Sequence, residues 1–246
     1  MLFMKPIKLA VSEVFYSIQG EGITTGYPSV FVRLGGCNLM CGGMGTQFDG
    51  ELHNGATWRC DTIEVWMKAI SKSLDEICGE EEHRAFKNGA HVIITGGEPM
   101  MQQDGVEKFI RYLRDLYPNL YVEVETNGTI IPSQTLQGLV NQWNCSPKLS
   151  NSGNHKNQSY NQYTISILNK LNTQFKFVIT TENDWLEVKD LYLPLIDKTK
   201  IWLMPSGENQ ELLNQSKQAV ADLVKYNYLK FTNRLHIEIW NKKTGV

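Results

Sequence analysis

Three of the five cysteines lie close together in the sequence, and their spacing is typical of metal ligands. Cys37 and Cys41 are separated by three residues, and Cys60 follows after a further eighteen. Thiolates are soft donors that suit zinc or iron–sulfur clusters. Three of them leave a four-coordinate site one ligand short. A four-iron cluster would keep one iron open, whereas His53 would complete a Cys3His zinc site. The spacing alone fits both kinds of site.

The other two cysteines, Cys78 and Cys145, stand apart, and we expect each to be a small buried apolar residue. An odd number of cysteines clustered toward one loop indicates a reducing compartment and a metal site rather than a disulfide framework. The segment between Cys41 and Cys60 is rich in glycine. This composition predicts a surface insert at about residues 42–57.

Further polar motifs each follow a segment that reads as a strand. They are Gly96-Gly97-Glu98, Glu125-Thr126-Asn127 and Ser146-Pro147-Lys148. Cys37 likewise follows the strand expected at 29–34. Because ligands gather at the C-terminal ends of parallel strands, the common placement of these residues predicts one shared site.

Strand-like and helix-like segments alternate along the chain. Apolar runs and period-two patterns predict strands at 11–18, 29–34, 91–95, 120–126, 175–179, 201–204 and 235–240. Spacings of three and four predict helices at 63–77, 106–116, 184–193 and 209–225, whereas the polar run 151–162 reads as a mobile loop. Such alternation indicates a parallel sheet with crossover helices. We therefore predict an α/β fold, a partial parallel β/α barrel of about six strands, in a single domain spanning 1–246.

Composition excludes several classes of partner. The chain has 24 basic and 26 acidic side chains, so it lacks the basic surplus of a nucleic-acid-binding protein, and we expect a small-molecule ligand. No apolar run approaches the ~18 residues of a membrane span. The start of the chain, 1–11, carries Lys5, Pro6 and Lys8 and has no signal-peptide core. We expect a cytoplasmic protein.

The cysteine loop resembles the cluster loop of radical S-adenosylmethionine (SAM) enzymes, in which three cysteines are separated by three and then two residues. Here sixteen extra residues lie between Cys41 and Cys60. With Ser17-Ile18-Gln19-Gly20-Glu21-Gly22 upstream and Cys60-Asp61-Thr62 after the insert, nearly the whole chain is similar to the 7-carboxy-7-deazaguanine synthase family. The resemblance implies the same partial barrel, with a [4Fe-4S] cluster, SAM and Mg²⁺ as cofactors.

In that family the open iron binds the amino and carboxylate groups of SAM, and electron transfer from the cluster splits a carbon–sulfur bond to give a 5′-deoxyadenosyl radical. The resemblance assigns the cluster to Cys37, Cys41 and Cys60 and requires no catalytic side chain, since the cofactor radical does the chemistry. It places SAM against Arg59, Cys60, Asp61, Gly97, Ser146, Pro147 and Lys148. Asp61 has a competing interpretation as a helix cap.

The resemblance also implies substrate and magnesium contacts. The matching threonine, Thr62, would bind Mg²⁺, although it too would serve as a helix cap. Substrate contacts would come from Ile18, Gln19, Gly20, Glu21, Arg33 and Thr95. Arg33 lies on the strand face opposite Val30, Val32 and Leu34, and its planar fork matches a carboxylate. The alternative for Arg33 is a surface position on an edge strand.

His236 and Glu238 share a face of the strand expected at 235–240 and could reach the pocket, although a satisfied core histidine is the more common finding.

The activity implied is that of a lyase of queuosine-type 7-deazapurine biosynthesis. It rearranges 6-carboxy-5,6,7,8-tetrahydropterin into 7-carboxy-7-deazaguanine with release of ammonia. A homodimer and an electron donor, flavodoxin or ferredoxin, are implied as partners. One alternative is a glycyl-radical activating enzyme, against which Gln19-Gly20-Glu21-Gly22 and Arg33 favour a small molecule. The other is a non-catalytic zinc-binding module that uses Cys37, Cys41, Cys60 and His53.

Overall fold

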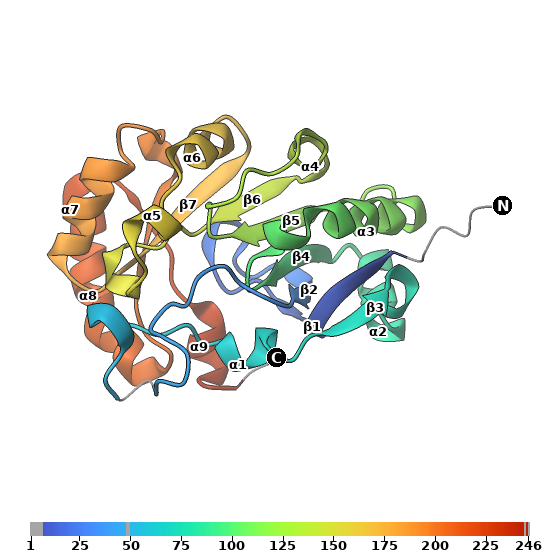
Figure 1. The fold of residues 1–246 in the computed structure, drawn as a ribbon, viewed down its shortest axis with the longest axis horizontal. Helices are drawn as coiled ribbons and strands as arrows, with labels where there is room; N and C mark the ends of the chain where they lie inside the picture. Colours follow the sequence, from blue (N-terminus) through green and yellow to red (C-terminus); the bar gives the residue numbers. More distant parts are fainter. Residues whose placement is uncertain (1–6, 48–49, 244, 246) are drawn as a thin grey trace.

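One curved sheet organises the chain. The computed structural model describes residues 7–47, 50–243 and 245. Residues 1–6 and 48–49 lie outside the described residues. The expectations for the start of the chain and for the insert also extend to these positions. Within the described residues the sheet has nine strands in the order β3-β1-β2-β4-β5-β6-β7-β8-β9 (Figure 1).

Most of the sheet is parallel. All pairings from β2 through β9 are parallel, and only β1 pairs antiparallel, with β2 on one side and β3 on the other. The strands are β1 Lys8–Ile18, β2 Pro28–Leu34, β3 Ile70–Ser73, β4 His91–Gly96, β5 Val122–Thr126, β6 Gln142–Cys145, β7 Thr173–Ile179, β8 Ile201–Pro205 and β9 Lys230–Phe231.

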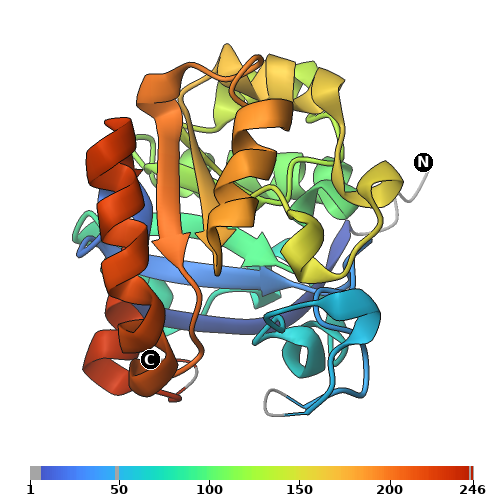
Figure 2. The same ribbon diagram turned by 90° about the vertical axis from the view of Figure 1, so that its left-hand side faces the viewer.

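The sheet curves without closing. Its two ends are β3 and β9. Figure 2 shows the blue strands near the start of the chain lying crosswise to the orange strands near its end, as the accumulated twist of a barrel-like sheet requires. The predicted fold class, a partial parallel barrel, is confirmed. The strand number is larger than expected because β3 extends one edge of the sheet and the two-residue β9 extends the other.

The two faces of the sheet differ in chemistry. On β2, the side chains of Val30, Val32 and Leu34 are fully buried in the apolar core on the outer face. Phe31 and Arg33, which alternate with them, line the inside of the barrel. This alternation places apolar residues against the helices and leaves Phe31 and Arg33 to face the interior.

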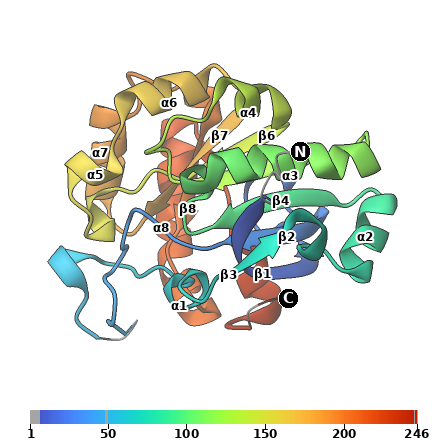
Figure 3. The ribbon, with the colours of Figure 1, turned by 45° about the vertical axis from the view of Figure 1, so that its right-hand side comes forward.

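Helices cover the outer face (Figures 1 and 3). The helix α3 shows why: Val106, Phe109, Ile110 and Leu113 recur at helical spacing and are all fully buried. The helices are α1 Ile63–Trp66, α2 Glu80–Lys87, α3 Gln103–Leu116, α4 Gln134–Leu139, α5 Lys156–Ser159, α6 Gln162–Asn169, α7 Glu182–Leu191, α8 Gln210–Asn227 and α9 Leu235–Trp240. Among the described residues, no helix is both long and apolar enough to cross a membrane.

The strand predicted at 235–240 is wrong, because this segment forms helix α9. The place beside β8 is taken by β9, and the chain then leaves the sheet for the loop after β1, where the N–H of Leu235 donates to the carbonyl of Gly20. The alternating Leu235, Ile237 and Ile239 suggested a strand, yet only Ile237 is buried and Ile239 is 51% exposed. Tertiary placement overrides the local pattern here.

The single helix predicted at 63–77 is also wrong. Helix α1 ends at Trp66, and the chain then forms β3, which pairs with β1 from Lys8 to Val11. The sheet offers an unpaired edge at β1, and the backbone of this segment satisfies its hydrogen bonds there rather than in a longer helix.

The polar run 151–162 is not a simple loop. It contains a 3-10 turn at Ser150–Ser152 and helix α5, and α6 begins at Gln162. Asn151 and Ser152 are buried. Their polar groups are tied to the cysteine loop, which explains why so polar a segment is ordered into turns.

Removing the side chain of Phe109 tests the importance of the α3 contact. F109A should lower the free energy of unfolding by about 3–5 kcal/mol, because a fully buried phenyl ring leaves a cavity. Urea unfolding followed by circular dichroism measures the change. The matched control is Y226A, whose ring is 74% exposed and whose loss should cost less than about 0.5 kcal/mol. Equal effects of the two changes would contradict the assignment of α3 to the core.

Candidate functional site

A cavity of about 820 Å³ opens at the C-terminal ends of the parallel strands. Its wall brings together segments that are distant in sequence: the cysteine loop, the loop after β1, the turns after β4, β5 and β6, and the residues around α9. All but one of the predicted site residues line it, namely Ile18, Gln19, Gly20, Glu21, Arg33, Cys37, Cys41, Arg59, Cys60, Asp61, Thr62, Thr95, Gly97, Ser146 and Lys148. Pro147 is buried beside them and does not line the cavity.

The cysteine loop is closed on itself despite the insert. The backbone N–H of Cys60 donates to the carbonyl of Cys41 at 3.1 Å, so the second and third cysteines are adjacent. The N–H of Gly42 donates to Ser152, and that of His53 donates back to Gly42. The insert therefore leaves and returns at nearly the same place, and in Figure 3 it projects away from the barrel.

The turn after β4 packs directly on the first cysteine. A Cβ atom on Gly97 would lie 1.9 Å from the carbonyl oxygen of Gly36 and 2.9 Å from Cβ of Cys37, so only glycine fits. Below it, the buried Glu98 accepts hydrogen bonds from the N–H groups of Met100 and Asn127. Burial raises the pKa of Glu98 despite these hydrogen bonds. Glu98 thus joins the turns that follow β4 and β5.

The three thiols of the cysteine loop share one partly buried environment. Burial raises the pKa of Cys37 to about 12 and that of Cys41 to about 11. The amide of Asn154 donates to Sγ of Cys41 at 3.3 Å. Cys37, Cys41 and Cys60 all line one cavity, and this donor set fits a four-iron cluster that keeps one iron free of protein ligands.

The zinc alternative is not supported. His53 packs against Gly43 and lines a separate hollow on the insert, away from the cavity that the cysteines share.

The residues after Cys60 are not helix caps by their side chains. Thr62 occupies the N-cap position of α1, but its hydroxyl makes no capping hydrogen bond; it lies 3.3 Å from Sγ of Cys60. The carboxylate of Asp61 accepts a hydrogen bond from Nη2 of Arg234 at 2.7 Å. Burial would raise the pKa of Asp61, but Arg234 holds it below its usual range. Both side chains are therefore available to the cavity.

The remaining residues expected near SAM are held by local contacts. Nζ of Lys148 donates to Oγ of Ser146 at 2.9 Å and lies 5.6 Å from the ring centre of Trp58. The guanidinium of Arg59 is almost fully buried and forms an ion pair with Glu64. These contacts fix two cations beside the cysteine loop.

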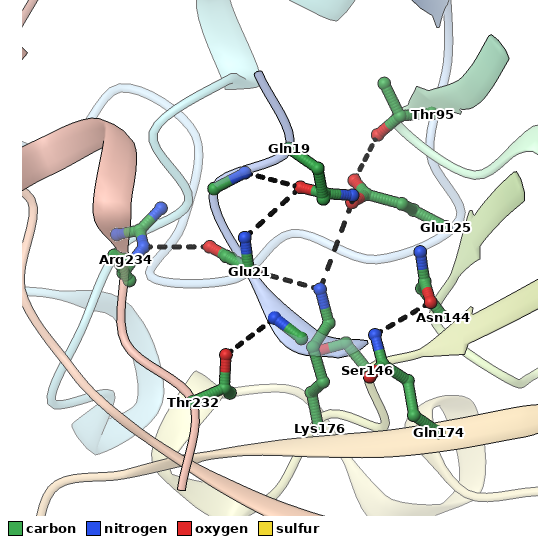
Figure 4. A network of polar contacts seen from close by, with 12 residues as sticks. Gln19, Glu21, Thr95, Glu125, Asn144, Ser146, Gln174, Lys176, Thr232 and Arg234 are labelled. Atoms are coloured by element: carbon green, nitrogen blue, oxygen red, sulfur yellow. Dashed lines mark hydrogen bonds and ion pairs between the residues drawn. The ribbon is translucent and has the colours of Figure 1, made fainter. Parts of the chain in front are cut away.

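The loop after β1 is the most polar part of the wall. Gln19 is 2% exposed, and its side-chain amide donates to Oε1 of Glu125 at 3.3 Å. Thr95 donates to the other oxygen of Glu125 at 2.7 Å. Figure 4 shows these groups converging from three elements. Sequence reasoning selected Gln19 and Thr95 but gave Glu125 no specific role.

Two buried cations were missed by sequence reasoning. Nζ of Lys176 lies 2.9 Å from Oε2 of Glu21 and 3.9 Å from Oε1 of Glu125, and Nε of Arg234 lies 3.0 Å from Oε1 of Glu21 (Figure 4). Burial would raise the pKa of Glu21, but the two cations hold it well below its usual range. A lysine between Phe175 and Phe177 in a buried strand was the signal that could have revealed Lys176.

Arg33 is an interior residue of the sheet. Strand β2 lies between β1 and β4, so the edge-strand alternative is wrong. Nε of Arg33 donates to Oε1 of Glu13, its cross-strand neighbour, at 2.6 Å, and the guanidinium lies 5.9 Å from the ring centre of Phe15. Among the described residues, its two terminal nitrogens have no hydrogen-bond partner, and Arg33 lines the cavity.

His236 and Glu238 do not share a strand face as predicted, because α9 separates them. His236 lines the cavity and packs against Gly20, and burial together with Arg234 lowers its pKa. Glu238 forms an ion pair with Lys217 outside the cavity.

Comparisons with known proteins agree with this site. Residues 18–144 match a family model described as a 4Fe-4S single cluster domain. Two proteins named 7-carboxy-7-deazaguanine synthase are similar along nearly their whole length. That of Halobacterium salinarum is 31% identical over 95% of this chain and 91% of its own, and that of Pyrobaculum aerophilum is 32% identical over 97% of both.

A solved structure, QueE from Escherichia coli, has the same fold. Its TM-score to this chain is 0.64, with 20% sequence identity, over 93% of this chain and 95% of that one.

Serine substitutions test the assignment of the cysteines. C37S, C41S and C60S should each abolish the iron–sulfur absorbance of the anaerobically reconstituted protein, because each removes one of three thiolate donors. The fully buried Cys145 and the remote Cys78 are controls, and C145S and C78S should retain it. A full cluster in C60S would show that the third ligand lies elsewhere. H53A should change little, whereas a zinc site would lose metal.

Proposed function

This chain belongs to the 7-carboxy-7-deazaguanine synthase family, and we propose that it converts 6-carboxy-5,6,7,8-tetrahydropterin into 7-carboxy-7-deazaguanine with release of ammonia. The observation that carries the proposal is the identity of 31–32% to synthases over at least 95% of the chain. The cavity supports it, because the cysteine loop and the polar loop after β1 face one another across it.

The cofactors are an iron–sulfur cluster and SAM. When bound, they supply a carbon-centred radical that takes a hydrogen atom from the substrate. Cys37, Cys41 and Cys60 would hold the cluster. SAM would be surrounded by Arg59, Asp61, Gly97, Ser146 and Lys148. The buried Pro147, which lies between the last two in the chain, would support them. The role of these residues is to orient the two molecules and to keep water from the reacting atoms.

The substrate would lie deeper, against the loop after β1. Gln19, Glu21 and Thr95 offer hydrogen-bonding groups there, beside the backbone of Ile18 and Gly20. Arg33 would bind the 6-carboxylate. Its Nε is engaged by Glu13, which leaves the terminal nitrogens to form a charge-assisted hydrogen-bond pair with a second carboxylate.

We further propose that Thr62 binds Mg²⁺ together with substrate oxygens. The hydroxyl of Thr62 supports this, because it lies on the cavity wall beside Sγ of Cys60 and makes no capping hydrogen bond, and magnesium keeps several waters and needs few protein ligands. We also keep the expectations of a single domain, a homodimer, a cytoplasmic location and reduction by flavodoxin or ferredoxin. The glycyl-radical activating enzyme alternative is not favoured, because the similar proteins are named as synthases.

The direct test is anaerobic reconstitution with iron and sulfide, followed by an assay with SAM, a reductant and the carboxytetrahydropterin. Formation of 7-carboxy-7-deazaguanine and ammonia in equal amounts is expected. SAM cleavage without any deazaguanine product would overturn the proposed substrate.

Replacing Arg33 by lysine tests its role as carboxylate ligand. R33K keeps the charge but loses the planar fork, so affinity for the carboxypterin should fall by about ten- to a hundred-fold, equivalent to roughly 1.5–3 kcal/mol. Isothermal titration of the reconstituted protein measures this change, while cluster content and SAM affinity should be retained.

A tetrahydropterin without the 6-carboxylate is the matched control ligand. It should bind weakly to the parent, and R33K should not weaken it further, because the contact removed was never made. An equal loss for both ligands would make Arg33 a structural residue.

Magnesium dependence tests Thr62. Turnover of the parent should rise on adding Mg²⁺, and T62A should lose that response because a magnesium ligand is missing. Cluster absorbance and SAM cleavage without substrate serve as controls and should persist in T62A. A T62A protein as responsive to Mg²⁺ as the parent would remove Thr62 from the site.

A further inference from the structure

The segment just before and within α9 is joined to the loop after β1 by several contacts. The N–H of Gly22 donates to the hydroxyl of the buried Thr232 at 2.6 Å, and the N–H of Leu235 donates to the carbonyl of Gly20 at 2.8 Å. A Cβ atom on Gly20 would lie 2.2 Å from Nδ1 of His236. The position of the substrate loop therefore depends on residues more than two hundred positions later in the chain.

Arg234, in this segment, uses each of its three nitrogens for a different part of the site. Nε donates to Oε1 of Glu21 at 3.0 Å, Nη2 to Oδ2 of Asp61 at 2.7 Å, and Nη1 to the carbonyl of Gly207 at 2.7 Å. Burial would lower the pKa of Arg234, but Asp61 and Glu21 raise it, so the guanidinium stays charged. The carbonyl of Gly207 holds it in place from the side.

The two carboxylates that share Arg234 belong to different halves of the cavity. Glu21 lies in the loop assigned to the pterin, and Asp61 lies between Cys60 and Thr62, in the turn assigned to SAM and magnesium. Glu21 also pairs with Lys176, whereas Asp61 makes no other hydrogen bond among the described residues. Arg234 is thus the direct polar bridge between the two halves.

We propose that Arg234 couples the binding of SAM to the binding of the pterin, an inference that rests on the proposed function. It acts as a positioning residue, through Asp61 and Glu21. A ligand that orders the turn at Cys60–Thr62 also orders the guanidinium and, through it, the loop at Glu21. The loop then loses less conformational entropy when the second ligand binds, so the second ligand binds more tightly. The effect is reciprocal, because linkage requires each ligand to raise the affinity for the other by the same factor.

The experiment measures the dissociation constant of SAM on the anaerobically reconstituted enzyme, with and without saturating 6-carboxy-5,6,7,8-tetrahydropterin. No reductant is present, so neither ligand is consumed. In the parent the pterin should tighten SAM binding by about five-fold or more, the lower end for coupled sites. In R234Q the ratio of the two constants should fall to about one, because the neutral amide cannot hold two carboxylates. The ratio is informative because a general loosening of the site would raise both SAM dissociation constants by the same factor and leave their ratio unchanged.

Two further variants keep the test decisive. R234K retains a cation that reaches fewer acceptors, so its ratio of SAM dissociation constants should lie between those of the parent and R234Q. If R234Q assembles no cluster, R234K takes its place in the test. K217Q breaks the ion pair between α8 and α9 outside the cavity and should keep the parent ratio.

A ratio of one in the parent, or a parental ratio in both Arg234 variants, would overturn the coupling and leave the proposed function standing. A parent that binds SAM but no carboxypterin would overturn both.

Discussion

The partial burial of Glu21, whose side chain is 16% exposed, is the constraint on which the arrangement of the cavity depends. A carboxylate removed from water must be neutralised or paired, and the cost of leaving it unpaired is several kcal/mol. Lys176 from β7 and Arg234 from the C-terminal segment approach it from different sides. Each cation then needs a second carboxylate, supplied by Glu125 and Asp61. The result is a chain of alternating charges that fixes the loop after β1 against elements from both ends of the sequence.

A second group of polar side chains lies next to this chain of charges and holds the loop after β1 against the sheet. The fully buried Glu123 accepts hydrogen bonds from Thr24 and Asn144, and Gln174 donates to Asn144 while accepting from the N–H of Ile23. Glu123 of β5 and Gln174 of β7 thus contact the loop directly, and Asn144 of β6 links the two; Figure 4 shows the contact between Gln174 and Asn144. An apolar interior could not orient a backbone turn in this way, because it would leave the N–H groups of the loop unsatisfied. The open barrel keeps a polar interior for that reason.

Local patterns in the sequence predicted the parts of the molecule that depend on local physics. Val30, Val32 and Leu34 marked a strand with one buried face, and the cysteine spacing marked the loop that now lines the cavity. The strand predicted at 235–240 failed because the alternation of Leu235 and Ile237 does not record that β9 takes the place beside β8 and that Leu235 bonds to Gly20 instead. Arg234 acquires its role only through partners from distant elements, and the sequence placed Glu125 at the shared site without giving its partners.

The closure of the cysteine loop also matters for the length of the insert. Two backbone hydrogen bonds fix the ends of the insert: Cys60 donates to Cys41, and Gly42 donates to Ser152. The backbone between these anchors contributes nothing to the spacing of the thiols, and lengthening a loop whose ends are fixed costs only about 0.6 kcal/mol per doubling. The cluster geometry is thereby insulated from changes in insert length. The insert is therefore a segment to which evolution can add residues at little cost to the site.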